Sequence, residues 1–248
     1  MVINDLPIGS RVRLGRYALI HRSDDMFDID WIKVSSENDF ISEKVLCGMR
    51  YDNYEGWSVN YDYHLSNIRQ FMNSDNCTWF SKTHTGDTPP APLFFDSGYR
   101  VDVMKYPGFL YHFMDAELSV IQKQNGDFLR LPYIDEISGG FQYFKKRGIR
   151  AHAVPSYDII ERGYIRSSGF TPYYAMSRNE DELFEICRNG QSALTSPAIA
   201  SGVRPVCRLI STTNVSCIGD NIYSCIIPDL TTVTYFKTSQ PLDWLLGL

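Results

Sequence analysis

The pattern of apolar and polar positions predicts strands at the start of the chain. Val12 and Leu14 alternate with arginines and a glycine, which is the period-2 pattern of a half-buried strand. Residues 29–34 repeat this alternation, and residues 40–49 form a third apolar run after a polar turn at residues 35–39. We therefore expect three strands in a meander, since short polar turns join neighbouring strands.

Three later segments change to the 3.6-residue period of helices. In residues 61–73 apolar side chains recur at i, i+3, i+6 and i+7, with Asn60 as a suitable N-cap. Residues 113–122 and 134–144 show shorter helical patterns, although two consecutive glycines inside the second weaken it by about 1 kcal/mol each. The helices are therefore expected to be short.

Strand patterns return in the second half of the chain. Residues 173–176 and 183–187 predict two strands joined by a turn, and residues 202–210 predict a further, central strand. Inside this last run, Gly202 allows a positive φ or a close backbone approach, and Pro205 indicates an edge or an irregular point of the sheet. These elements predict an α+β protein with mixed antiparallel sheets, two or three short helices and long loops.

The longest of these loops, residues 74–108, is rich in polar residues and prolines and shows no periodicity. Loops of this length are usually functional or inserted segments. Its aromatic side chains would form a contact surface if exposed and would fix the loop to the body if buried, and both alternatives stay open. Four aromatic residues from this loop and from the second half of the chain are candidate ligand contacts: Trp79, Phe80, Tyr173 and Tyr174.

The C-terminal part differs from the rest of the chain. We expect one domain over residues 1–213 and a β-rich extension over residues 214–248. The last residues are apolar and will not stay solvated, so they pack on their own domain or dock on a partner, and docking is favoured. The candidate docking residues are Trp244, Leu245, Leu246 and Leu248.

Composition supports a folded protein and excludes several partners. Hydrophobic residues make up 44% and charged residues 21% of the 248 residues, so disorder is not expected to dominate. The net charge is −5 and no basic run exceeds residues 145–147, so there is no electrostatic footprint for nucleic acid. No stretch is apolar enough to span a bilayer, and the first residues do not resemble a signal peptide. We therefore expect synthesis in a cytoplasm.

The sequence shows no constellation for catalysis or metal binding. The six cysteines include no C-x-x-C pair and no zinc spacing, so they are expected to be free thiols, mostly buried. Motifs of the G-x-S-x-G, phosphate-loop and H-E-x-x-H types are absent. The acidic runs at residues 135–136 and 180–182 are interpreted as solvated faces. These observations predict a non-enzymatic protein without a cofactor; they nominate no metal-ligating residues, and metal binding stays open.

Six short motifs, ending in Gly-Val-Arg-Pro, follow one another between residues 7 and 211. They occupy residues 9–17, 29–32, 65–73, 129–137, 164–167 and 202–205. In this order they resemble the motifs of a family of uncharacterised bacterial and bacteriophage domains, a variant of the C-type-lectin-like fold shared with formylglycine-generating enzymes. The resemblance implies a C-type-lectin-like fold for this chain.

Two arginines, Arg166 and Arg204, stand in apolar strands within these motifs. A buried guanidinium needs carboxylate or carbonyl partners, because an unpaired buried charge is strongly destabilising. We expect both arginines to be structural clamps rather than ligand contacts. Gly202 and Pro205 are expected to be structural for the backbone reasons given above.

The resemblance also implies a function, because the family occurs in phages and prophages. Folds of this kind present loops from a rigid scaffold, which suits binding. We expect a virion protein, made in the host cytoplasm, that is a decoration, fibre or receptor-binding component. It would bind a host-surface glycan or protein and contact other virion proteins or sister subunits. The alternative is a cytosolic protein-interaction module or inhibitor.

An enzymatic function is implied less well. Formylglycine-generating enzymes use a closely spaced cysteine pair near the C-terminus. Here Cys207 follows the Gly-Val-Arg-Pro motif, but the next cysteine is Cys217. This spacing departs from the enzyme pattern, so the oxidoreductase activity is not carried over and is the least favoured alternative.

Deletion of residues 237–248 distinguishes the two non-enzymatic expectations. For a virion protein, the truncated chain is expected to keep its circular dichroism spectrum and to be lost from purified particles. Unchanged incorporation into particles would support the cytosolic interaction module instead.

Overall fold

The computed structural model describes residues 1–18, 26–51, 61–76, 107–145, 151, 153, 170–179, 182–197, 199 and 201–227. Two β-sheets dominate these residues, and the helical segments between them are short. This arrangement confirms the predicted α+β class. No helix in the described part of the chain is long and apolar enough to cross a membrane.

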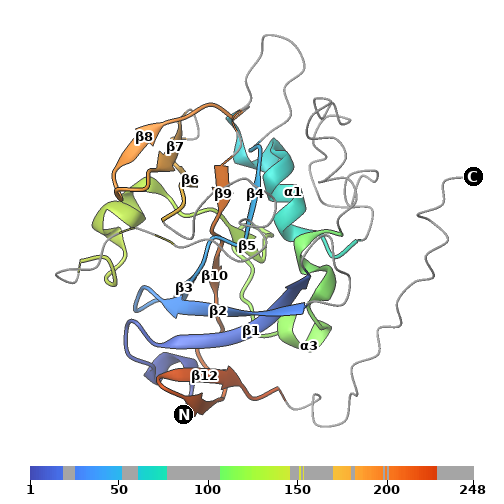
Figure 1. Cartoon of the computed structure of the whole chain (residues 1–248). Helices are drawn as coiled ribbons and strands as arrows, with labels where there is room; N and C mark the ends of the chain where they lie inside the picture. The colour runs from blue at the N-terminus through green and yellow to red at the C-terminus, as the bar shows by residue number, and fades with distance from the viewer. Residues whose placement is uncertain are drawn as a thin grey trace, which may run out of the picture.

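The first sheet has seven strands and contains the N-terminal hairpin (Figure 1). Its neighbouring strands are antiparallel except for one parallel pair, formed by β1 and β12. From edge to edge the strands are β11 (Val215–Gly219), β12 (Ile222–Cys225), β1 (Arg11–Ala18), β2 (Met26–Lys33), β3 (Asp39–Ser42), β10 (Val206–Arg208) and β5 (Leu129–Arg130).

The second sheet has five strands and lies beside one end of the first (Figure 1). Its strands, in order, are β4 (Cys47–Met49), β9 (Ser201–Val203), β6 (Tyr173–Met176), β7 (Leu183–Ile186) and β8 (Ser192–Leu194). The predicted strand pair at residues 173–176 and 183–187 is confirmed, because β6 and β7 are antiparallel neighbours.

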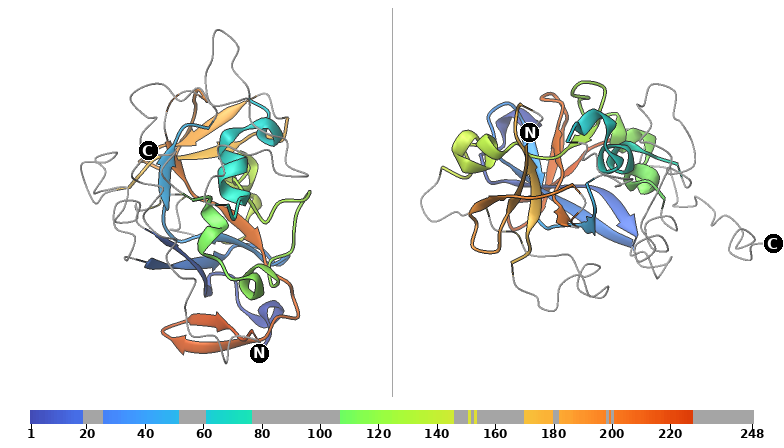
Figure 2. Two further views of the ribbon diagram at one scale, coloured as in Figure 1. Left: turned by 90° about the vertical axis from the view of Figure 1, so that its right-hand side faces the viewer. Right: turned by 90° about the horizontal axis from the view of Figure 1, so that it is seen from above.

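The helical segments flank the strands on two sides. Figure 2 shows α1, η3 and α3 together on one side and η4 on the other. In chain order the segments are η1 (Ile3–Asp5), η2 (Tyr63–Leu65), α1 (Asn67–Asn73), η3 (Phe109–His112), α3 (Asp115–Leu118) and the π-helix η4 (Glu136–Gly140).

Apolar side chains are buried on both faces of the first sheet. Trp31 and Phe40 belong to the larger of two core clusters, whereas their neighbours Ile32 and Ile41 belong to the smaller one, which includes Ile137 of η4. Successive residues of a strand point to opposite faces. Both faces of β2 and β3 are therefore covered, which explains why all four residues of β3 are buried.

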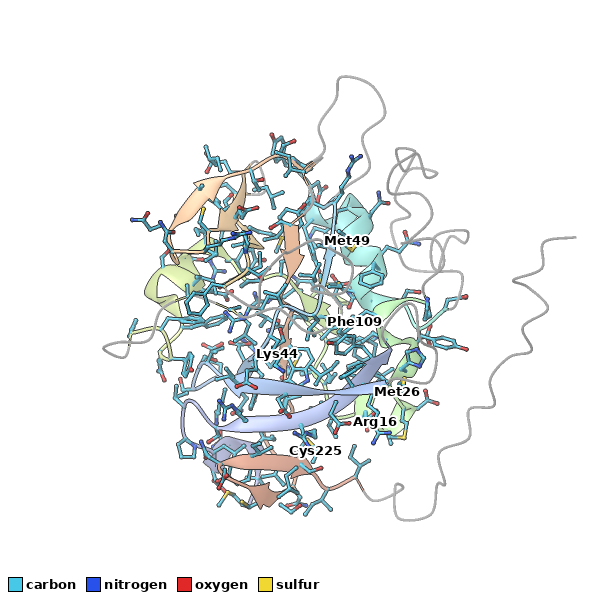
Figure 3. The ribbon with its side chains drawn as sticks, in the orientation of Figure 1. Arg16, Met26, Lys44, Met49, Phe109 and Cys225 are labelled. Atoms are coloured by element: carbon cyan, nitrogen blue, oxygen red, sulfur yellow. The ribbon has the colours of Figure 1, made fainter. Side chains whose placement is uncertain are left out.

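A bulge in β1 makes room for the larger core. The pairing of β1 with β2 shifts register between Arg13 and Arg16, and Gly15 has a φ of 75°. A Cβ at Gly15 would overlap the ring of Phe113. That ring lies 6.0 Å from the ring of Phe109, which Figure 3 shows in the interior of the molecule. Glycine is therefore required here for both its conformation and its small size.

Two adjacent strand pairs cross from one sheet to the other at the same place. Strands β3 and β10 are neighbours in the first sheet, and β4 and β9 are neighbours in the second. The chain passes from β3 into β4, and later from β9 into β10, so both connections link the same two sheets. At this crossing the Ser42 N–H donates to Pro205 O at 3.0 Å, and the Leu46 N–H donates to Val203 O at 2.9 Å. The crossing joins the two sheets into one body.

The predictions of one strand at residues 40–49 and one at residues 202–210 are therefore wrong. Each segment forms two strands in different sheets, because the chain turns at the crossing while its residues remain mostly buried on either side. Continuous burial hides such a turn from the hydrophobic pattern. Pro205 lies between β9 and β10, where its missing N–H cannot extend a ladder, and this is the irregular point that was predicted.

Arg204 lies at this crossing with 2% exposure. Its Nε donates to Ser42 O at 3.0 Å, and its Nη1 donates to Tyr173 Oη at 3.2 Å and to Ala151 O at 3.4 Å. The guanidinium also lies over the rings of Tyr173 and Phe144, 5.2 and 6.0 Å from their centroids. No carboxylate pairs with it among the described residues, so carbonyl, hydroxyl and ring contacts compensate its burial.

Gly202 beside it serves a close backbone approach rather than a positive φ. Its N–H donates to Pro172 O at 3.1 Å, and a Cβ at this position would lie 2.5 Å from the same oxygen. A larger residue would push apart β9 and the segment that leads into β6. The steric alternative given by the sequence is therefore the one observed.

The predicted helix over residues 61–73 is broken in two. Segment η2 and helix α1 are separated by Ser66, whose Oγ accepts a hydrogen bond from the Arg69 N–H at 3.3 Å. Ser66 therefore caps α1, and the predicted cap Asn60 lies outside the described residues.

Other elements also differ from their sequence predictions. The pattern at residues 134–144 yields only the π-helix η4, in which Gly139 has a φ of 128°. The helix expected over residues 113–122 is limited to the single turn of α3. Strand β8 was missed, because its three residues are exposed and carry no alternating pattern.

The expected C-terminal extension enters the main sheet. Strand β12 pairs with β1 in parallel, and β11 pairs with β12 at the sheet edge. Figure 3 shows Cys225 of β12 next to the N-terminal hairpin. Residues 215–225 thus continue the sheet formed by residues 1–213, whereas residues 228–248 lie outside the described part.

Replacement of Arg204 by methionine is expected to lower the free energy of unfolding by about 2 kcal/mol. The methionine keeps the volume but leaves Ser42 O and Tyr173 Oη without their donor. Arg16→Met is the control, because Arg16 pairs with Asp28 at the surface and such pairs contribute little. Urea denaturation checks both variants, and equal midpoints for the two would contradict a clamp at Arg204.

Candidate functional site

The structure corrects the ligand role expected for Tyr173 and Tyr174. Both side chains are 0% exposed. The Tyr173 hydroxyl donates to Ala151 O at 2.7 Å, and the Tyr174 hydroxyl accepts from the Tyr51 N–H at 3.1 Å and contacts Ile199 O. Burial raises the pKa of Tyr173, so the hydroxyl stays neutral. These tyrosines are packing residues of β6, because no external ligand can reach them.

Other expected site residues cannot be placed. The described part of the chain does not include the following: Trp79, Phe80, Arg166, Trp244, Leu245, Leu246 and Leu248. Gly202, Arg204 and Pro205 are described, and all three lie at the crossing between the sheets. The sequence-selected residues therefore do not come together in one described site.

A polar cleft of about 680 Å³ is the strongest candidate site in the described residues. Six separate stretches of chain line it: the turn before β3, η2, the turn before β5, β5 with η4, the turn after β6, and β10. Its volume lies within the range of small-ligand pockets, roughly 300–1,000 Å³. Its lining is mostly polar or charged and includes Glu37, Asp39, Tyr63, His64, Gln122, Lys123, Gln124, Asn125, Asp127, Arg130, Tyr133, Glu136, Arg178 and Arg208.

One end of the cleft is built around Arg208 of β10. Its Nε and Nη2 bind the two carboxylate oxygens of Asp39 at 2.9 and 3.1 Å, and Nη2 also binds Glu37 at 2.9 Å. The hydrogen bond to Asp39 raises the pKa of the Arg208 guanidinium above its ordinary value. Bidentate pairing of this kind fixes both partners in orientation.

The other end is built around Arg130 of β5. Its Nη1 and Nη2 each bind one carboxylate oxygen of Glu136 at 2.8 Å. Gln124 links the two ends, since its Oε1 accepts from Arg130 Nε at 2.9 Å and its Nε2 lies 3.4 Å from Asp39 Oδ1. Charged and amide groups therefore form a continuous hydrogen-bonded floor.

Arg178 extends this floor toward solvent. Its Nε donates to Asp135 at 2.8 Å, and its Nη2 lies 3.7 Å from Glu136 Oε1. The ring of Tyr133 contacts both Arg130 and Arg178, whose guanidinium carbons lie 5.0 and 4.5 Å from its centroid. The hydrogen bond to Asp135 raises the pKa of Arg178.

The structure corrects the solvated interpretation of residues 135–136. Glu136 is 7% exposed and holds Arg130, although Asp135 next to it is exposed. Neither periodicity nor a motif indicated the cleft, because its residues come from distant parts of the chain. One local signal was present: Asn125-Gly126 is a two-residue hairpin turn, and it brings Gln124 and Asp127 together.

The carboxylates of this cleft are all paired with arginines. Every carboxylate that lines it is held by a guanidinium: Glu37 and Asp39 by Arg208, Glu136 by Arg130, and Asp127 by Arg69 at 2.8 Å. Carboxylate oxygens that accept hydrogen bonds from a guanidinium are less open to a reacting group of a ligand. Within the described residues, no group of three His, Cys, Asp or Glu side chains could hold a metal ion.

The described cysteines are free thiols, as expected. Cys47, Cys207 and Cys225 are buried, Cys187 is half-buried and Cys217 is exposed. Burial raises the pKa of Cys207 well above its ordinary value, with Asp39 adding to the effect, and burial raises the pKa of Cys225 to about 12. Thiolate is the reactive form, so these buried thiols are inert near neutral pH.

No protein-family model, no curated protein sequence and no solved structure matches this chain. The function is therefore proposed from the residues of the cleft and from the ordered motifs of the sequence.

Alkylation at pH 8 is expected to separate the thiols of the folded protein. Cys217 should react with iodoacetamide, whereas Cys207 and Cys225 should react only after unfolding in urea, because their raised pKa values keep them protonated. Peptide mass spectrometry measures each site. Native labelling of Cys207 as fast as that of Cys217 would restore the nucleophilic-thiol alternative.

Proposed function

We propose that this protein is a non-enzymatic binding component of a bacteriophage particle that contacts the host surface. The observation that carries the binding function is the polar cleft, whose carboxylates are all neutralised by arginines while other donors stay accessible. The resemblance of the ordered motifs over residues 7–211 supports a decoration, fibre or receptor-binding role, and it also supports a C-type-lectin-like arrangement of the α+β fold.

The arrangement of the cleft supports a binding role in a second way. Its floor is fixed by bidentate ion pairs and by Gln124, so its shape is set before a ligand arrives. Preorganised groups lose little conformational freedom on binding. The Arg178 side chain is 58% exposed, which makes it the most exposed arginine among the ion pairs of the cleft. Only the side chain of Glu37, which is 72% exposed, is more open to a ligand.

Location in a virion is proposed together with synthesis in the host cytoplasm. Sister subunits or other virion proteins would then be the permanent partners, and the host surface the transient one. The cytosolic interaction module is the competing outcome, and it would bind a soluble protein instead of an envelope.

Saturation binding to bacterial envelopes tests this proposal. Labelled full-length protein is mixed with envelope preparations from a panel of bacterial strains, and Arg178→Gln is compared with Arg188→Gln. Arg188 is exposed in the turn between β7 and β8 and does not line the cleft. Arg178→Gln is expected to weaken binding about tenfold, because it removes a charged donor, and Arg188→Gln is expected to bind as the parent does.

Two outcomes would contradict the proposal. Absence of saturable binding to every envelope would remove host attachment. Saturable binding with the same affinity in the Arg178→Gln variant would show that the protein attaches through a site other than the cleft.

A further inference from the structure

We infer that the cleft binds an uncharged saccharide, through amide side chains and without a metal ion. This inference rests on the proposed function and specifies its ligand. Neutral glycans are thereby favoured as ligands over the phosphate- or carboxylate-bearing polymers of bacterial surfaces, which would bind through their charge.

The first reason is the balance of charge in the cleft. Four carboxylates line it, from Glu37, Asp39, Asp127 and Glu136, and four cationic side chains oppose them, from Lys123, Arg130, Arg178 and Arg208. The cleft therefore carries no net charge, although the whole chain carries −5. An anionic ligand would need an excess of cationic groups and a cationic ligand an excess of carboxylates. Neither excess is present.

The second reason is the kind of group that the cleft presents to a ligand. Within the described residues, the side-chain amides of Gln122 and Asn125 make no hydrogen bond to protein, and both side chains are exposed at the cleft. An amide offers donors and an acceptor together. A sugar hydroxyl is also both donor and acceptor, so each amide can pair with neighbouring hydroxyls of one ring.

The third reason is the rigidity of the hairpin that carries these amides. Gln124 and Asp127 exchange backbone hydrogen bonds of 2.8 and 3.0 Å across the Asn125-Gly126 turn. Asp127 is buried and held by Arg69, with contacts of 2.8 to 3.0 Å. Before the turn, the Gln122 N–H donates to Arg208 O at 2.8 Å. Both amides are therefore presented from a fixed backbone.

A peptide ligand fits the cleft less well. An extended peptide usually adds a strand to an open sheet edge. Strand β5 is the edge nearest the cleft, but at Leu129 that edge is occupied by a side chain. The Leu129 N–H donates to Asn73 Oδ1 at 2.9 Å, and Leu129 O accepts from Asn73 Nδ2 at 2.8 Å. Because the backbone of Leu129 is already paired with Asn73, a peptide strand cannot add to the edge at this residue. Recognition of sugar hydroxyls by side chains therefore fits the cleft better than recognition of a peptide backbone.

The test uses matched double variants of the full-length protein. Gln122→Ala with Asn125→Gly removes both amides, and glycine tolerates the φ of 54° at residue 125. The control is Gln191→Ala with Asn221→Gly, because both of these amides are exposed outside the cleft and Asn221 has a similar φ of 63°. Gln191 Oε1 accepts one exposed hydrogen bond from Asn189 Nδ2 at 2.7 Å, so the thermal midpoint of the control also measures the loss of that contact. Equal thermal midpoints establish that both double variants fold.

Affinity is measured on immobilised uncharged glycans and on phosphate-bearing teichoic acid. We expect saturable binding to at least one uncharged glycan, about a tenfold loss in the cleft double variant, and no loss in the control. Excess chelator should have no effect. A rise in NaCl from 50 to 500 mM should change the affinity less than twofold, since no net charge is neutralised.

The failure of this inference can be told apart from failure of the proposed function. Envelope binding that survives periodate oxidation of sugars, is lost on proteolysis of the envelope, or falls steeply with salt would overturn the neutral saccharide and leave host attachment standing. Chelator-sensitive binding would overturn the metal-free site in the same way. Absence of binding to every envelope and every glycan would overturn both.

Discussion

The buried guanidinium of Arg204 is the contact on which the rest of the structure depends. It lies where two adjacent strand pairs leave the seven-stranded sheet and enter the five-stranded one, and it binds Ser42 on the first pair and Tyr173 on β6. A backbone that turns between sheets loses ladder hydrogen bonds, and these must be replaced. Arg204 supplies donors at this point, and Pro205 and Gly202 supply the break and the close approach.

This crossing also determines where the cleft can form. Strand β10 begins directly after it and carries Arg208, while β3 ends at it and begins with Asp39, so the Arg208–Asp39 pair is set by the strand register. Strand β5 pairs with β10 on its other side and brings Arg130 to the same region. The charged floor is thus a consequence of the order β3-β10-β5, although its residues are far apart in the sequence.

The sequence predicted local structure correctly where a strand has one buried face or where a single residue interrupts a strand. The period-2 alternation at Val12 and Leu14 identified β1, and Pro205 identified the irregular point. The crossing was hidden, because residues on both sides of it are buried alike. The sequence could not show that Tyr173 and Tyr174 are 0% exposed, since aromatic side chains suit a binding loop and a buried strand equally well. The cleft was hidden because its pairs are non-local, and Glu136 is known as a buried acid only once Arg130 is placed beside it.

Hydrogen–deuterium exchange with bound glycan tests the central claim, that the cleft is the ligand site, most directly. Exchange would be followed by mass spectrometry on the full-length protein, with and without the uncharged glycan that binds it most tightly. The account predicts slower exchange in residues 35–37, 122–127 and 141–142, which line the cleft. Protection confined to other segments, such as residues 74–106 or 228–248, would contradict it and would locate binding on the aromatic loop or the C-terminal tail.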